Sequence, residues 1–189
     1  MTQSLNANPP QVFPEDLFTQ KESIGQWRVA KTKSRREKAL AGFLCSRGLA
    51  YYLPMIKKRQ PGKGRVRYSL VPVFSGYVFF RSGDNERYQA FTSGHMAGVI
   101  EVKDEASLLK DLDQVRRAIN LDAPLYPYDF VASGDEVEIT AGPFKGLQGI
   151  IQRKKNNFRL ILNIECLSRS LALDIEADMV QPLNLGLTV

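Results

Sequence analysis

The spacing of apolar residues along the chain predicts which segments are helices and which are strands. Leu40, Phe43 and Leu44 lie three and four residues apart, as on one face of a helix, and predict a helix over about 35–47. The same spacing recurs over 105–119 and predicts a second long helix. Short runs of β-branched and aromatic residues, typical of strands, lie between and after these helices. Helices and strands in this irregular order predict an α+β fold with an antiparallel sheet.

The residues at the start of the first predicted helix have the pattern of a capping box, Ser-x-x-Glu. In such a box the Ser34 hydroxyl accepts a hydrogen bond from an N–H group of the first turn, while Glu37 reaches back to the cap residue. Gly48 follows the apolar positions and provides a stop signal at the other end. We therefore expect the helix to begin next to Ser34 and to end before Gly48.

Apolar runs with few charges predict the strands of the N-terminal half, together with a short helix over 86–92. The segment 57–67 differs from these runs because it is strongly basic and contains Pro-Gly and Gly-x-Gly turn sequences. It therefore predicts a β-hairpin whose tip and legs carry positive charge. The predicted strands are 26–30, 51–56, 70–74, 76–80 and 99–102.

Proline and glycine residues divide the chain into expected domains. Pro124 and Pro127 mark a linker, and after Gly134 short alternating strands with frequent turns predict a small β-barrel. The N-terminal residues show no periodicity, which predicts a flexible leader. The expected organisation is a leader over 1–25, a first domain over 26–120, a linker over 121–133, a barrel over 134–183 and a tail over 184–189.

Composition narrows the classes of function. The 189 residues are 43% hydrophobic, which is enough for a packed core without disulfides or a structural metal. No apolar run reaches the ~18 residues of a membrane span, and the N-terminal residues lack the apolar region of a signal peptide, so we expect a cytoplasmic protein without membrane contact. Because His95 is the only histidine, one chain cannot form a two-histidine metal site, and His95, which follows Ser93 and Gly94, is expected to be a loop residue and not a catalyst. No catalytic residue, metal or cofactor is predicted.

The net charge of +6 conceals an uneven distribution. Residues 27–81 contain fourteen lysines and arginines and a single acid, Glu37, whereas residues 82–144 contain twelve acids and five bases. A basic segment of this strength favours a polyanionic partner such as nucleic acid. The alternative is that the acidic segment neutralises the basic one within the folded chain.

Two sets of motifs carry a resemblance to a known family. Gly-Asp-Glu-Val at 134–137, followed by Gly-Pro-Phe-Lys-Gly-Leu-Gln-Gly at 142–149, resembles a KOW motif. Trp-Arg-Val at 27–29 and Val-Pro-Val-Phe-Ser-Gly-Tyr-Val-Phe-Phe at 71–80 resemble the N-terminal (NGN) domain of NusG, with Ser75 in place of the usual proline. In tandem these motifs make the chain similar to NusG-family transcription elongation factors. The leader and the basic first helix resemble those of the specialised RfaH-like antiterminators.

The resemblance implies that the first domain binds RNA polymerase, on the clamp helices of the β′ subunit. Its docking residues correspond here to Tyr77 and Phe79, which alternate on one predicted strand and therefore share a face. An apolar surface on one strand suits contact with a pair of helices. The alternative, that both residues only pack beneath the second long helix, stays open on sequence alone.

The resemblance also implies contact with upstream or non-template DNA, and a KOW partner that is either Rho or a small-subunit ribosomal protein. A monomeric factor that modulates pausing or termination is therefore expected. Two alternatives stay open: the hairpin can be a solvated loop without a ligand, and the chain can be a ribosome- or RNA-binding KOW protein without polymerase contact. The predicted nucleic-acid contacts are Lys33, Ser34, Arg35, Arg36, Arg47, Lys57, Lys58, Arg59, Lys63, Arg65 and Arg67. The predicted KOW partner surface comprises Phe144, Leu147, Leu167 and Arg169.

Overall fold

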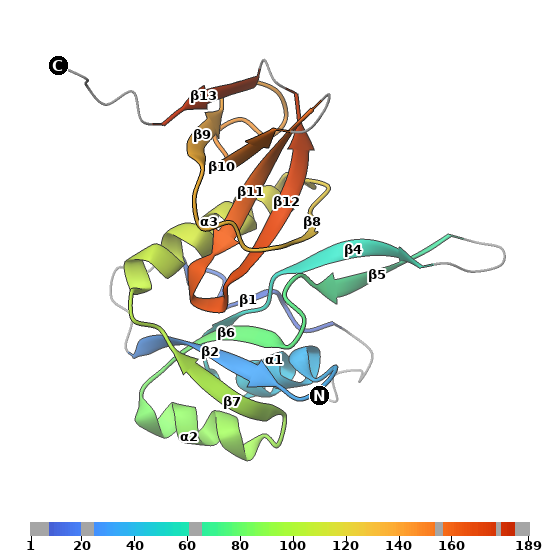
Figure 1. The fold of residues 1–189 in the computed structure, drawn as a ribbon. Helices are drawn as coiled ribbons and strands as arrows, with labels where there is room; N and C mark the ends of the chain where they lie inside the picture. Colours follow the sequence, from blue (N-terminus) through green and yellow to red (C-terminus); the bar gives the residue numbers. More distant parts are fainter. Residues whose placement is uncertain (1–7, 20–24, 61–65, 154–156, 177–178, 184–189) are drawn as a thin grey trace. The chain divides into compact units, whose positions relative to one another are not determined.

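The computed structural model describes residues 8–19, 25–60, 66–153, 157–176 and 179–183. Its contacts divide the chain into two compact units, Met1–Glu105 and Ala106–Val189, and each unit is described by itself. Figure 1 shows the elements of both units, coloured from blue at the N-terminus to red at the C-terminus. Almost all of the second long helix groups with the second unit, although its sequence position suggested the first domain.

The first unit is built on a five-stranded antiparallel sheet with the order β1-β3-β6-β2-β7. Strand β2 lies between β6 and β7 and pairs with both of them. The strands predicted over 26–30, 76–80 and 99–102 are confirmed, with boundaries that differ by a few residues. The run 51–56 divides into β3 and the start of a separate strand, β4 (Met55–Gln60), and β1 was not predicted. The strands are β1 (Val12–Phe13), β2 (Gln26–Thr32), β3 (Tyr51–Tyr52), β6 (Tyr77–Ser82) and β7 (Met96–Glu101).

Two helices, α1 (Glu37–Ser46) and α2 (Asp84–Thr92), lie on the same side of this sheet (Figure 1). The first of them confirms the helix predicted over 35–47. Helix α1 presents an apolar face with Leu40, Ala41 and Leu44 to the strands, whereas the mostly polar α2 buries only Ala90. The resulting core includes Leu40, Leu44, Val78, Phe80 and Ala90, all of them fully buried.

The opposite face of the sheet carries an aromatic cluster. Trp27, Tyr52 and Phe79 lie on β2, β3 and β6 and are at most 2% exposed. The ring of Phe18 stacks on Trp27 with centroids 6.2 Å apart and meets Tyr52 edge-on at 5.1 Å. Phe74 meets Phe79 edge-on at 6.0 Å. Edge-to-face and offset contacts of this kind add stability beyond the burial of apolar area.

Part of the N-terminal segment belongs to the fold, so the prediction of a flexible leader is wrong over residues 8–19. Strand β1 pairs with β3 at the edge of the sheet, and Leu17 is only 3% exposed. The Tyr51 hydroxyl donates a hydrogen bond to the carbonyl of Pro10 at 2.8 Å, across 41 positions of sequence. Contacts over such a separation leave no trace in local periodicity, which is why the sequence pattern did not predict them.

The predicted basic hairpin is confirmed. Its legs, β4 (Met55–Gln60) and β5 (Arg67–Pro72), pair with each other in a separate two-stranded ladder that extends away from the five-stranded sheet in Figure 1. The base of the hairpin is buried, since Met55 is 1% exposed, whereas the legs carry exposed cations. The predicted contacts Lys63 and Arg65 lie outside the described residues.

The second unit combines helix α3 (Glu105–Asn120) with a six-stranded antiparallel sheet of order β13-β9-β10-β11-β12-β8. Both the long helix and the alternating strands were predicted, and the α+β class is confirmed. Between β11 and β12 the chain makes one short 3-10 turn, Glu165–Leu167. The strands are β8 (Tyr126–Tyr128), β9 (Asp135–Ile139), β10 (Gln148–Arg153), β11 (Phe158–Ile164), β12 (Arg169–Ile175) and β13 (Val180–Pro182).

The segment predicted as a linker contributes strand β8, which pairs with β12. Arg159 on β11 is 8% exposed, and its guanidinium carbon lies 5.2 Å from the ring centre of Tyr126 and 4.7 Å from that of Tyr128. Asp174 accepts hydrogen bonds from the Arg159 guanidinium at 3.0 Å and from the Tyr126 hydroxyl at 2.8 Å. Two cation–π contacts and the hydrogen bond from Tyr126 to Asp174 therefore help to hold β8 on the sheet.

Candidate nucleic-acid interface

The basic loop, residues 33–36, joins β2 to α1 and exposes all four of its side chains. The Lys33 N–H donates to the carbonyl of His95 at 2.9 Å, and the Arg36 N–H donates to the carbonyl of Lys33 at 3.1 Å. Arg35 lies in the left-handed region, with φ of 57°. This tight turn brings three cations next to the N-terminus of α1, where the helix dipole and first-turn N–H groups also favour an anion.

Glu37 does not form the predicted capping box. The N-cap residue is Arg36, without a capping side-chain hydrogen bond, so Ser34 lies too early in the chain to bind the first turn. The Glu37 carboxylate is buried instead and accepts a hydrogen bond from the Gly76 N–H at 2.7 Å. The Gly76 carbonyl in turn accepts one from the Thr32 N–H at 2.8 Å. Gly76, with φ of 86°, therefore joins the start of α1 to the end of β2.

Tyr77 and Phe79 differ in accessibility although they lie on the same face of β6. Tyr77 follows Gly76 directly, pairs with Lys31 of β2 and is half-buried. Phe79 is 0% exposed, because it lies within the aromatic cluster between Phe74 and Tyr52. The expected pair of exposed docking residues therefore reduces to Tyr77, which lies at the same end of the sheet as the basic loop.

The hairpin adds exposed cations to this unit, and its base is tied to α1. The Lys38 ammonium group donates to the carbonyl of Leu70 on β5 and to the side-chain oxygen of Asn8, both at 2.6 Å. Arg47 is exposed at the C-terminal end of α1, with its guanidinium 5.4 Å from the ring centre of Phe43. Helix α1 thus anchors both the basic loop and the hairpin. The exposed cations of the described hairpin legs are Lys57, Lys58, Arg59 and Arg67.

The acidic segment of the chain neutralises a buried arginine. Arg28 on β2 is 5% exposed and forms ion pairs with Glu101 at 3.0 Å and with Asp84 at 3.4 Å. Internal neutralisation, the alternative considered for the basic segment, therefore accounts for Arg28. The hairpin differs, because the sequence contains no acid at all from residue 38 to residue 83. The exposed cations of the loop and hairpin face solvent and form a surface suited to a polyanion.

The predicted partner surface in the C-terminal sheet is accessible only in part. Leu147 is 0% exposed and Leu167 is 8% exposed, so both leucines belong to the interior of the second unit. Phe144 is half-buried, and Arg169 is exposed at the start of β12. The motif spacing identified the turns that carry these residues but did not specify which side chains point outward.

Comparison with models of protein families gives two matches to the chain. The model for transcription termination factor NusG matches residues 25–121, and the model for the KOW motif matches residues 133–158. The first match alone spans just over half of the sequence. The chain belongs to the NusG family. The resemblance carried by the two sets of motifs is thus confirmed for the family, whereas a comparison with curated proteins found no match.

NusG-family proteins are transcription factors without enzymatic activity. Within the described residues of this NusG-family chain, no group of three or more histidine, cysteine or acidic side chains is placed to hold a metal ion. Cys45 and Cys166 are half-buried thiols. Burial raises the pKa of Cys166 to about 11, so this thiol stays protonated and unreactive near neutral pH. Among the helices that the structure describes, none is long and apolar enough to cross a membrane.

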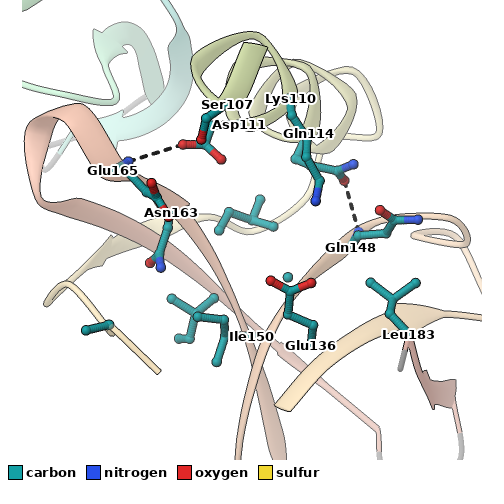
Figure 2. A pocket seen from close by; sticks show the side chains of 14 residues that line it. Ser107, Lys110, Asp111, Gln114, Glu136, Gln148, Ile150, Asn163, Glu165 and Leu183 are labelled. Carbon is teal, nitrogen blue, oxygen red and sulfur yellow. Dashed lines mark hydrogen bonds between the residues drawn. The ribbon is translucent and has the colours of Figure 1, made fainter. Parts of the chain in front are cut away.

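A polar pocket with a volume of about 180 Å³ lies in the second unit. Residues of α3 and of the KOW sheet line it (Figure 2). Two α3 side chains reach across it to backbone groups. Asp111 accepts a hydrogen bond from the Glu165 N–H at 3.1 Å, and Gln114 accepts one from the Gln148 N–H at 2.9 Å. Because these groups satisfy backbone donors, the polar lining joins the last helix of the NusG match to the KOW sheet.

The sequence pattern does not indicate the residues that organise the interface of this NusG-family protein. It predicts a capping box for Glu37 and presents Gly76 only as part of the motif at 71–80. The glycine was the available signal, because a glycine between two strands indicates a backbone conformation that other residues adopt at a cost. The partner of its N–H group, a carboxylate 39 positions earlier, has no sequence signal.

Proposed function

We propose that this NusG-family protein binds RNA polymerase through its first unit, contacts the DNA of the elongation complex through the basic loop and hairpin, and so modulates pausing or termination. The geometry around Gly76 carries the proposal. Its two hydrogen bonds, to Glu37 and from Thr32, hold the basic loop beside Tyr77. An accessible aromatic ring and several cations thus share one end of the sheet, as contact with both polymerase and DNA requires.

Tyr77 is the proposed anchor for the clamp helices of the polymerase β′ subunit. Phe79 supports it from within the aromatic cluster, two residues further along the same face of β6. Tyr77 is half-buried, so part of the residue stays accessible to a partner, and tyrosine is enriched among the residues that dominate binding energy at interfaces. Truncation of such an anchor costs about 2 kcal/mol or more of binding free energy.

The exposed cations are proposed to bind DNA phosphates. Arginine side chains can hold phosphate oxygens in a bidentate manner, and the first N–H groups of α1 point at the same region as the basic loop. Each neutralised phosphate releases counterions, which lowers the slope of log affinity against log salt by about 0.7 on a single strand. The accessible cations are Lys33, Arg35, Arg36, Arg47, Lys57, Lys58, Arg59 and Arg67.

The KOW sheet is proposed to recruit a further partner, either Rho or a small-subunit ribosomal protein. Phe144 and Arg169 are its accessible candidates, an aromatic ring and a cation. Such a pair suits an apolar patch with an acidic rim on the partner. Leu147 and Leu167 contribute from the interior by shaping the turns that carry the two contact residues.

Binding to purified RNA polymerase tests the polymerase contact. We expect Tyr77→Ala to weaken binding about tenfold or more, in line with the loss of an aromatic anchor. Tyr88→Ala is the matched control, because Tyr88 is 73% exposed on α2 and lies outside the proposed surface. Equal affinity of both variants would remove Tyr77 from the interface. Binding to ribosomes alone, unaffected by Tyr77→Ala, would support the alternative of a ribosome-associated KOW protein.

Affinity for DNA at several salt concentrations tests the cationic surface. Arg35→Glu should weaken binding and flatten the salt dependence by about one phosphate contact. Lys103→Glu is the control, since it changes the net charge equally at an exposed residue outside the loop and hairpin. If both variants show the same slope as the wild type, the basic loop does not bind phosphate. Transcription through a terminator, with and without the protein, then measures the consequence for pausing or termination.

A further inference from the structure

The hairpin presents an exposed aromatic ring among cations. Tyr68 on β5 is 67% exposed. Arg59 lies directly opposite it on β4, and Lys57 lies two residues away along the same face. Side chains directly opposite one another have Cβ atoms about 4.5–5.5 Å apart, and diagonal neighbours are about 7–8 Å apart, so these three side chains form one patch. We call Lys57, Arg59 and Tyr68 the hairpin patch.

We propose that the hairpin patch binds single-stranded DNA by stacking an unpaired base on the ring of Tyr68, while Arg59 and Lys57 contact the neighbouring phosphates. This inference rests on the proposed function, which brings the hairpin to DNA. It adds a base-stacking contact and the residue that would make it, Tyr68, which the basic pattern of the segment does not single out.

The arrangement matches what a single strand requires. Side chains stand roughly perpendicular to a strand pair, so an exposed tyrosine on a hairpin leg offers a face of its ring to a ligand. In duplex DNA the faces of the bases are covered by their neighbours, and only an unpaired base has a free face to stack. The cations supply the phosphate contacts that position the strand. Because no acid occurs from residue 38 to residue 83, nothing in this stretch of sequence repels the phosphates.

Other exposed or cation-stacked tyrosines of the chain have different surroundings. Tyr88 is as exposed as Tyr68, at 73%, but shares α2 with Asp84 and Glu86, which repel a phosphate backbone. Tyr126 in the second unit already has the guanidinium of Arg159 over its ring, 5.2 Å from the ring centre. Tyr68 therefore combines an exposed ring with a cationic environment. Tyr88, with a similar exposed fraction, provides a matched control.

Fluorescence anisotropy with the full-length chain and a labelled DNA single strand of about twelve nucleotides measures the stacking. We expect Tyr68→Ala to weaken binding by about five- to hundredfold, as for other stacked bases, with an unchanged salt slope because no phosphate contact is lost. Tyr68→Phe keeps the ring and should bind like the wild type. Tyr88→Ala should also bind like the wild type. Unchanged emission of Trp27, which is 1% exposed, shows that each variant is folded.

A strand of the same length that carries abasic sites, and therefore lacks the bases but keeps the phosphates, provides the decisive comparison. The wild type should lose affinity on this strand, whereas Tyr68→Ala should lose nothing further, since its stacking partner is already absent. If Tyr68→Ala binds single-stranded DNA as tightly as the wild type while Arg35→Glu binds weakly, stacking is refuted and the proposed function stands. If the wild type binds no DNA, both the stacking by Tyr68 and the proposed DNA contact are refuted. A loss confined to duplex DNA or to an RNA strand of the same sequence also overturns the proposal.

Discussion

Replacement of Glu37 tests how the interface is built. Glu37→Ala removes the acceptor of the Gly76 N–H and leaves this donor, in a partly buried environment, without its 2.7 Å hydrogen bond. A hydrogen bond to a charged group contributes about 1.5–3 kcal/mol. The negative charge in the first turn of α1 contributes a further 0.3–1 kcal/mol, approximately, through the helix dipole. We therefore expect Glu37→Ala to lower the free energy of unfolding of the first unit by about 2–4 kcal/mol.

Urea unfolding followed by the emission of Trp27 measures this change. Trp27 is the only tryptophan of the chain and is buried in the first unit, so its emission reports on that unit. With a slope of about 2 kcal/mol per molar urea, the expected loss shifts the midpoint of unfolding by roughly 1–2 M. Glu37→Gln keeps an acceptor oxygen and should lose less than half as much.

Glu86→Ala is the matched control, because Glu86 also occupies the first turn of a helix of the first unit, α2. It removes the interaction with the helix dipole alone and should cost no more than about 1 kcal/mol. Equal losses for Glu37→Ala and Glu86→Ala would refute the reasoning, since the hydrogen bond to Gly76 would then contribute nothing. DNA affinity can also be measured without urea, where Glu37→Ala is fully folded. A loss of affinity there would show that the hydrogen bond between Glu37 and Gly76 positions the basic loop.

Two further predictions concern the two cores. Phe79→Ala empties the centre of the aromatic cluster and should lower the free energy of unfolding by about 3–5 kcal/mol, measured by urea titration; a loss below about 1 kcal/mol would contradict tight packing. In the second unit, the hydrogen bond from Tyr126 and the guanidinium of Arg159 lower the pKa of Asp174. The stabilisation that results is present above the ordinary carboxyl pKa of about 3.9 and is lost as pH falls through the lowered value. Asp174→Asn should therefore flatten the acid dependence of unfolding followed by circular dichroism, and an unchanged profile would exclude this pair.

The positions of the main elements could be predicted because their apolar spacing is local. Leu40 and Leu44 identify α1 from five consecutive residues, and the alternation over 158–164 identifies β11 in the same way. Strand β1 has only two residues and is specified by its pairing with Tyr51 and Tyr52, which lie far along the chain. Its existence depends on tertiary pairing, which no local pattern encodes.

The charges of the candidate site could be predicted from the sequence, but the arrangement of its residues could not. The exposed cations of the basic loop and hairpin follow from residue type, because lysine and arginine are rarely buried without partners. Accessibility of apolar residues does not follow from type, and Phe79 and Leu147 proved to be fully buried. Arg35 adopts a left-handed conformation, and the N-cap residue of α1 is Arg36 instead of Ser34. A capping pattern in the sequence does not predict this conformation.

Strand β8 changes what the connection after α3 can do. Thirteen residues, 121–133, were expected to form a linker, but only five of them separate the end of α3 from the start of β8. Five extended residues span at most about 18 Å. As long as Arg159 holds β8 in place, the KOW sheet stays within that reach of the C-terminal end of α3. The connection after α3 is therefore too short to let the KOW sheet separate from this helix, to which Asp111 and Gln114 also join it by hydrogen bonds.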